Sequence, residues 1–172
     1  MLVEAAVGLG AGIAARSVLL TAFGFDSVIE LLSGMALLRL LTGRSDESVT
    51  RRLSAILLVL LCAYTALFSV GGLVFRIEPE TSVAGIAVSA IAIVTMPLLA
   101  TAKRRVNRVL ESPSLRADIA ESVTCAYLAA LTLMGLAAGT LTGWWWVQYA
   151  AALCLLLWLI PEAREAAGRG GE

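Results

Sequence analysis

The chain has 172 residues, of which 59% are hydrophobic and 15% are charged, and its formal net charge is zero. A typical soluble domain is about 45–50% apolar, so this composition excludes an ordinary soluble protein and indicates an integral membrane protein. Zero net charge gives no reason to expect nucleic-acid binding. The length leaves no room for a separate soluble domain, so we expect one transmembrane domain over residues 1–172.

Six apolar segments are separated by charge clusters and by glycine or proline, and each is expected to form a helix. A spanning helix needs about 20 apolar residues. The last five segments meet or approach that length, whereas the first spans only with tilt or local thinning, unless further residues precede it. Five spans plus a re-entrant first segment is the alternative to an all-α bundle of six transmembrane helices. The expected helices cover residues 2–15, 17–38, 53–75, 83–102, 116–138 and 144–161.

Lysine and arginine are concentrated on one side of this predicted bundle. The 38–53 segment holds four, the 102–116 segment five and the C-terminal tail two, whereas the other side has only Arg16 and Arg76. Short basic loops stay in the cytoplasm, so both termini are expected there. The expected membrane is the plasma membrane, which is the inner membrane in a bacterium. The eleven residues are Arg39, Arg44, Arg51, Arg52, Lys103, Arg104, Arg105, Arg108, Arg116, Arg164 and Arg169.

Two local patterns predict how helices are anchored and packed. Trp144, Trp145 and Trp146 open the last predicted helix at the outer interface, and we interpret them as an anchor because indoles prefer that depth. Gly8 and Gly12 form a small-xxx-small pair, which favours a close crossing with another helix.

The predicted helix 17–38 contains Asp26 and Glu30 but no lysine, arginine or histidine. An ionised side chain near the bilayer centre costs about 2.5–3.5 kcal/mol even on a lenient scale. The two acids are one helical turn apart and share a face, which Ser33 continues. Because no basic residue is nearby in sequence, this pair predicts a site for a compensating cation.

A second polar stripe lies on the predicted helix 116–138, where Asp118, Glu121, Ser122 and Cys125 share one side. Glu121 and Cys125 repeat the four-residue spacing of the first pair. The other cysteines, Cys62 and Cys154, have no acid at helical spacing and are expected to pack as small apolar residues. An odd number of cysteines argues against a disulfide framework.

Glu30 and Cys125 are each nine residues from a basic residue at the cytoplasmic side, Arg39 and Arg116. At 1.5 Å per residue both lie about 13 Å deep, close to the middle of a core about 30 Å thick. Packed antiparallel, the two helices offer three carboxylates and one thiol, a set that suits a tetrahedral zinc-like ion; carboxylates alone favour Mg²⁺, Ca²⁺ or Mn²⁺. The predicted metal ligands are Asp26, Glu30, Glu121 and Cys125, with Ser33, Ser122 and Thr124 as hydrogen-bonding neighbours.

Other interpretations stay open for these residues. Asp26 and Glu30 can be protonated and hydrogen-bond between helices, or form a proton relay without metal, and Cys125 can be a buried apolar side chain. Glu4 is either a further polar group of the site or an interfacial residue. Asp118 is either an entry residue or a hydrated acid at the helix end.

The run FDSVIELLSG resembles the second transmembrane helix of the cation diffusion facilitator (cation efflux) family, whose motif is two acids, or His and Asp, four apart. The run SPSLRADIAESVTCAYL resembles that family's fifth helix, where an Asp precedes a His-xxx-Asp pair by three residues. On these motifs Asp26 and Glu30 match the first pair, and Glu121 and Cys125 match the His and the second Asp. GWWW before the last apolar segment is similar to the start of the family's sixth helix.

The resemblance implies a six-helix protomer, usually a homodimer, that exports a divalent metal in exchange for protons by alternating access. The family's cytoplasmic C-terminal metal-binding domain has no counterpart here, so the chain is similar to a short single-domain branch, and dimerisation is expected through the membrane helices. The chain also contains no histidine, so the implied site is Asp/Glu/Glu/Cys.

We therefore expect proton-coupled efflux of Zn²⁺ or a related divalent cation, and no enzymatic activity. Crowded carboxylates hold protons when the site is empty and release them when metal binds. One alternative is a non-transporting metal-binding membrane protein that senses metal or modulates a partner. Another is a proton-coupled carrier of small organic cations, but this would need an aromatic-lined cavity and only Phe23 and Phe25 lie near the acids.

Overall fold

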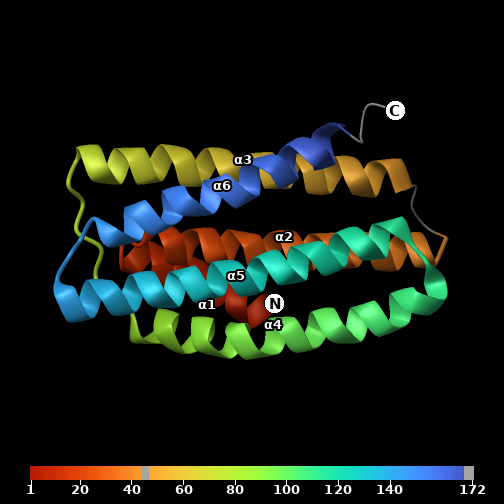
Figure 1. Ribbon diagram of the computed structural model, residues 1–172, viewed down its shortest axis with the longest axis horizontal. Coiled ribbons are helices and arrows are strands. Elements are labelled where there is room, and N and C mark those ends of the chain that lie inside the picture. Colours follow the sequence, from red (N-terminus) through yellow and green to blue (C-terminus); the bar gives the residue numbers. More distant parts are fainter. Residues whose placement is uncertain (44–46, 169–172) are drawn as a thin grey trace.

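The computed structural model describes residues 1–43 and 47–168, which form a bundle of six helices without a strand. The all-α expectation is thus confirmed for the described residues, and the helices run along the long axis of the bundle (Figure 1). Arg44 and Arg169, counted above as cytoplasmic charges, lie outside the described residues. The helices are α1 (Leu2–Ala14), α2 (Val18–Leu41), α3 (Glu47–Val74), α4 (Val83–Leu110), α5 (Pro113–Thr142) and α6 (Val147–Gly168).

Four helices of the described chain are long and apolar enough to cross a membrane, as expected of an integral membrane protein. The remaining two apolar helices are shorter. With 13 residues, α1 is about 20 Å long, and its N-terminal end lies near the middle of the bundle's length (Figure 1). The four long segments are Val18–Leu40, Ala55–Val74, Val83–Leu110 and Asp118–Thr142, and the shorter ones are Leu2–Ala14 and Val147–Pro161.

The outside of the bundle is apolar while several hydroxyl groups are inside. On α3, Leu67 is 71% exposed, and on α4, Leu98 is 64% exposed. Thr65, Ser69 and Ser89 on the same two helices are fully buried. Such large exposed apolar faces are unusual in a soluble monomer, and they fit helices that contact lipid.

The segment 102–116, expected to be a cytoplasmic loop, is mostly helical. α4 continues to Leu110, so only Glu111 and Ser112 connect it to α5. Glu111 adopts the left-handed conformation (φ 48°), the Ser112 side chain caps α5, and Pro113 occupies the first turn, where its missing N–H costs no hydrogen bond. The expectation of a loop was wrong because a run of charged residues was interpreted as a loop. A helix can continue beyond the apolar layer, because its backbone hydrogen bonds are made within the helix.

Other predicted boundaries also move. α2 extends to Leu41 and α3 begins at Glu47, so both ends of the 38–53 segment are helical. α6 begins only after the three tryptophans. Trp144 and Trp146 are exposed and stack with ring centroids 5.8 Å apart. Their role as a membrane anchor stays a prediction.

Glycines bring α1 into close contact with α2. A β-carbon added at Gly8 would lie 2.7 Å from Cα of Gly24, and one at Gly12 would lie 2.6 Å from the amide nitrogen of Thr21. Both neighbours are backbone atoms, which cannot move aside as a side chain does. The predicted close crossing at this small-xxx-small pair is confirmed.

Replacing Gly24 with alanine is therefore expected to destabilise the protein. The new methyl group would meet the backbone of α1 at Leu9, and overpacking typically costs about 1–3 kcal/mol, which exceeds the gain of at most about 1 kcal/mol from alanine's helix propensity. Gly34→Ala on the same helix is the control because nothing lies within 4 Å of its added β-carbon. Thermal unfolding in detergent should show a lower melting temperature for Gly24→Ala alone; equal melting of both variants would contradict the close contact.

Candidate metal-binding site between α2 and α5

α2 and α5 lie side by side and run antiparallel in the middle of the bundle (Figure 1). α2 also contacts α1, α3 and α6, so its polar side chains have little access to solvent. The antiparallel register brings the two polar stripes of the sequence face to face. Three polar pairs cross this interface: Asp26 with Cys125, Glu30 with Ser122, and Ser33 with Glu121.

All four residues predicted as metal ligands lie at this interface. Asp26 and Glu30 are 5% and 4% exposed, Cys125 is fully buried, and Glu121 is partly buried. Glu121 and Cys125 are both within electrostatic range of Asp26 and Glu30. The structure therefore brings the two halves of the predicted site together at one level of the bundle.

Serine hydroxyls donate a hydrogen bond to one carboxylate oxygen of Glu30 and of Glu121, and the second oxygen of each carboxylate receives none from the described side chains. Ser122 Oγ donates to Glu30 Oε1, and Ser33 Oγ donates to Glu121 Oε1 at 3.2 Å. Among the described residues no hydrogen-bond partner is found for the buried Oε2 atoms of Glu30 and Glu121. A buried acceptor without a partner is costly, so these oxygens are available to a cation or a proton.

The described side chains, as they stand, include no group of three His, Cys, Asp or Glu residues that could hold a metal ion. Ser122 and Lys103 are the direct partners of Glu30 in this arrangement. The role of the four residues as metal ligands therefore stays a prediction.

An ammonium group lies among these acids. Lys103 Nζ is 2.8 Å from Asp118 Oδ2 and 3.5 Å from Glu30 Oε1, and it donates a hydrogen bond of 2.7 Å to Ser122 Oγ. The two carboxylates are buried, and 19% of the Lys103 side chain is exposed. The expectation that Lys103 lies in a loop was wrong: it is a residue of α4, and its ammonium contacts the buried carboxylates of Asp118 and Glu30.

The helical periodicity of α4 predicts that Lys103 lies on the buried face of this helix. The buried residues of α4 include Val88, Ala92, Met96 and Ala100, which recur every four residues on one face. Lys103 follows three residues later on that face, and no glycine or proline interrupts α4 between Ala100 and its end. A helix that continues past the first charge must therefore turn Lys103 inward.

The structure also decides between the alternatives left open for Asp118. Asp118 is 4% exposed and pairs with Lys103, so the interpretation as a hydrated acid at the helix end is wrong. Glu4 is 8% exposed, pairs with the N-terminal ammonium at 2.6 Å and lies within electrostatic range of Cys125, and both interpretations of this residue stay open. Of the other cysteines, Cys62 is partly buried and Cys154 is exposed.

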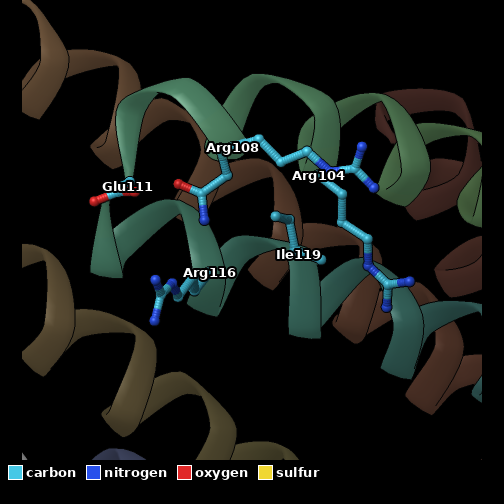
Figure 2. A pocket seen from close by; sticks show the side chains of 6 residues that line it. Arg104, Arg108, Glu111, Arg116 and Ile119 are labelled. Atoms are coloured by element: carbon cyan, nitrogen blue, oxygen red, sulfur yellow. The ribbon is translucent and has the colours of Figure 1, made fainter.

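Arginines line an open cavity of about 500 Å³ at the end of the bundle next to this ion pair. Figure 2 shows Arg104 from α4 and Arg116 from α5 with side chains that point away from each other. Arg104 follows Lys103 in the chain, and Ile119 follows Asp118. The cavity is lined by Arg104, Asn107, Arg108, Glu111, Arg116 and Ile119.

Neither the comparison with protein-family models nor the comparison with curated proteins finds a match for this chain. The resemblance to the cation efflux family therefore rests on the motif residues of the second and fifth helices. Those residues are the ones that meet between α2 and α5 in the structure.

Removing one partner of the Lys103–Asp118 pair is expected to destabilise the protein. Asp118→Leu leaves the ammonium without its nearest carboxylate and should lower the free energy of unfolding by about 3 kcal/mol, the lower end for a buried pair because Lys103 is partly exposed. The double variant Lys103→Met/Asp118→Leu removes both charges and should recover at least half of that loss. Glu78→Leu, at an exposed acid outside the helices, is the control. Denaturant unfolding in micelles measures all of these, and a double variant no more stable than Asp118→Leu would argue against the pair.

Proposed function

We propose that this chain is a transporter of a divalent cation, with Zn²⁺ as the first candidate, that binds the ion between α2 and α5 and exports it in exchange for protons. The observation that carries this proposal is the set of buried carboxylate oxygens beside a thiol. Glu30 Oε2, Glu121 Oε2 and Asp118 Oδ1 are buried and, within the described part of the chain, have no hydrogen-bond partner. Ionisable groups inside a membrane usually mark an ion or proton pathway.

The donor set suits a borderline-soft ion. Asp26, Glu30 and Glu121 supply oxygen and Cys125 supplies sulfur, a mixture that Zn²⁺ accepts in tetrahedral sites. The serine hydroxyls on Glu30 and Glu121 orient the carboxylates, as neighbours of metal ligands commonly do. Bringing the ligands to bonding distance requires α2 and α5 to shift their side chains relative to the arrangement described.

Proton coupling follows from competition for the same atoms. A carboxylate or thiol that binds a divalent ion must be deprotonated, so ion binding releases protons and low pH weakens binding. Asp26, Glu30 and Glu121 repel one another when all are ionised. An ion on one side of the membrane and protons on the other can therefore occupy the site in turn.

We further propose six spans with both termini in the cytoplasm, in a plasma membrane that is the inner membrane in a bacterium. The C-terminal end of α2, the N-terminal end of α3, the α4–α5 connection and the C-terminal end of α6 lie at one end of the bundle (Figure 1), and these helix ends carry most of the basic residues in the described part of the chain. Short basic segments remain cytoplasmic. Six spans require α1 and α6 to cross with tilt or local thinning. The exposed apolar helix faces and the family resemblance support a homodimer formed within the bilayer.

Transport is tested with purified protein in liposomes that contain a fluorescent Zn²⁺ reporter, under an imposed pH gradient. The wild-type chain should take up Zn²⁺, and Asp26→Asn should lower the initial rate at least about tenfold, because even an outer hydrogen bond to a ligand is commonly worth that much. Glu78→Gln, at an exposed acid far from the site in sequence, should retain the wild-type rate.

Two outcomes of that assay would change the proposal. Equal uptake by wild type and Asp26→Asn would remove Asp26 from the site. Stoichiometric Zn²⁺ binding without uptake would favour the alternative, a metal-binding membrane protein that senses metal or modulates a partner.

The thiol is tested with Co²⁺, whose bond to a thiolate gives an intense near-ultraviolet charge-transfer band. Cys125→Ser should abolish that band and weaken Zn²⁺ binding about tenfold, since thiolate is the softest ligand of the predicted set. Cys154→Ser is the matched control because Cys154 is exposed. A charge-transfer band that persists in Cys125→Ser would exclude Cys125 as a ligand.

A further inference from the structure

Lys103 contacts the two carboxylates unequally. Its Nζ is 2.8 Å from Asp118 Oδ2 but 3.5 Å from Glu30 Oε1. Glu30 Oε1 also accepts a hydrogen bond from Ser122, which in turn accepts one from Lys103. The ammonium is therefore bound more closely by Asp118, and its contact with Glu30 is the weaker of the two.

These two carboxylates also differ in their place in the site. Glu30 is one of the four predicted ion ligands, whereas Asp118 is not and lies one helical turn nearer the basic end of the bundle than Ser122. A divalent ion bound at Glu30 would stand a few ångströms from the ammonium, and like charges at that distance in a dry site repel strongly. The ion and the ammonium cannot both occupy Glu30.

We propose that Lys103 is a tethered counter-cation: its ammonium neutralises Glu30 when no ion is bound, and it withdraws to Asp118 when a divalent cation binds. This inference rests on the proposed function, because it takes Glu30 as an ion ligand. The flexible four-carbon side chain allows the movement without a change in α4. Asp118 then serves as the resting partner that keeps the ammonium paired.

A tethered cation weakens the equilibrium binding of the ion and raises the rate at which the ion is released. It lowers the affinity for the ion, since binding must displace it, and it speeds release, since it returns to Glu30 as the ion leaves. It also spares the empty site the cost of an unpaired carboxylate inside the membrane. A purely structural lysine would not produce this combination.

The test is equilibrium Zn²⁺ binding by the full chain in nanodiscs at one fixed pH, and Zn²⁺ uptake into liposomes under the same imposed pH gradient for every variant. Lys103→Met should tighten the dissociation constant at least about fivefold, the lower end of typical coupling between two sites, and should slow uptake at saturating Zn²⁺. Lys103→Arg retains a cation and should stay closer to the wild type in both measurements. Arg104→Met removes the neighbouring, exposed charge and should change neither.

The outcomes separate this inference from the proposed function. If the wild-type chain and Lys103→Met both fail to bind Zn²⁺, the proposed function is wrong and the inference falls with it. If the wild type binds and the folded Lys103→Met binds equally or more weakly, only the inference is overturned. Should Lys103→Met not fold, Lys103→Met/Asp118→Asn removes the pair together, and the same tighter binding is required of it.

Discussion

The structure depends on one electrostatic constraint: carboxylates placed inside an apolar bundle must be matched by a cation, a proton or a hydrogen-bond donor. Glu30 and Asp118 are almost fully buried. Lys103 forms ion pairs with both carboxylates, and Ser122 donates a hydrogen bond to Glu30. Leaving such groups unpaired in a bilayer costs several kcal/mol. The arrangement of α2, α4 and α5 satisfies this requirement, since α2 contributes Glu30, α4 contributes Lys103, and α5 contributes Asp118 and Ser122.

Packing fixes the level at which these groups meet. Gly8 and Gly12 let α1 press against α2, and a connection of two residues, Glu111 and Ser112, holds α4 tightly against α5. The short connection places the end of α4 beside the start of α5, so that Lys103 and Asp118 face each other across it. A longer loop would let the two helices slide, and the ammonium would lose its position over the acids.

The helices and the two polar faces of the site, on α2 and α5, could be predicted from the sequence. Apolar segments between charge clusters indicated the helices, and the four-residue spacing of Asp26 with Glu30 and of Glu121 with Cys125 identified two faces that meet. The partner supplied by α4 could not be predicted in this way, because Lys103 stands first in a run of basic residues that normally marks a loop. Charge type alone does not tell which turn of a helix leaves the membrane.

The sequence by itself determined that this is a helical membrane protein with acids in its apolar segments, because hydropathy and helical periodicity are local properties of the chain. Only the tertiary structure decided which cation stands beside those acids. Lys103 and Glu30 are 73 residues apart, and their encounter depends on how α2, α4 and α5 pack rather than on any pattern within one segment. Of the two acids that predicted a cation from outside the protein, Glu30 already lies 3.5 Å from one, the ammonium of Lys103.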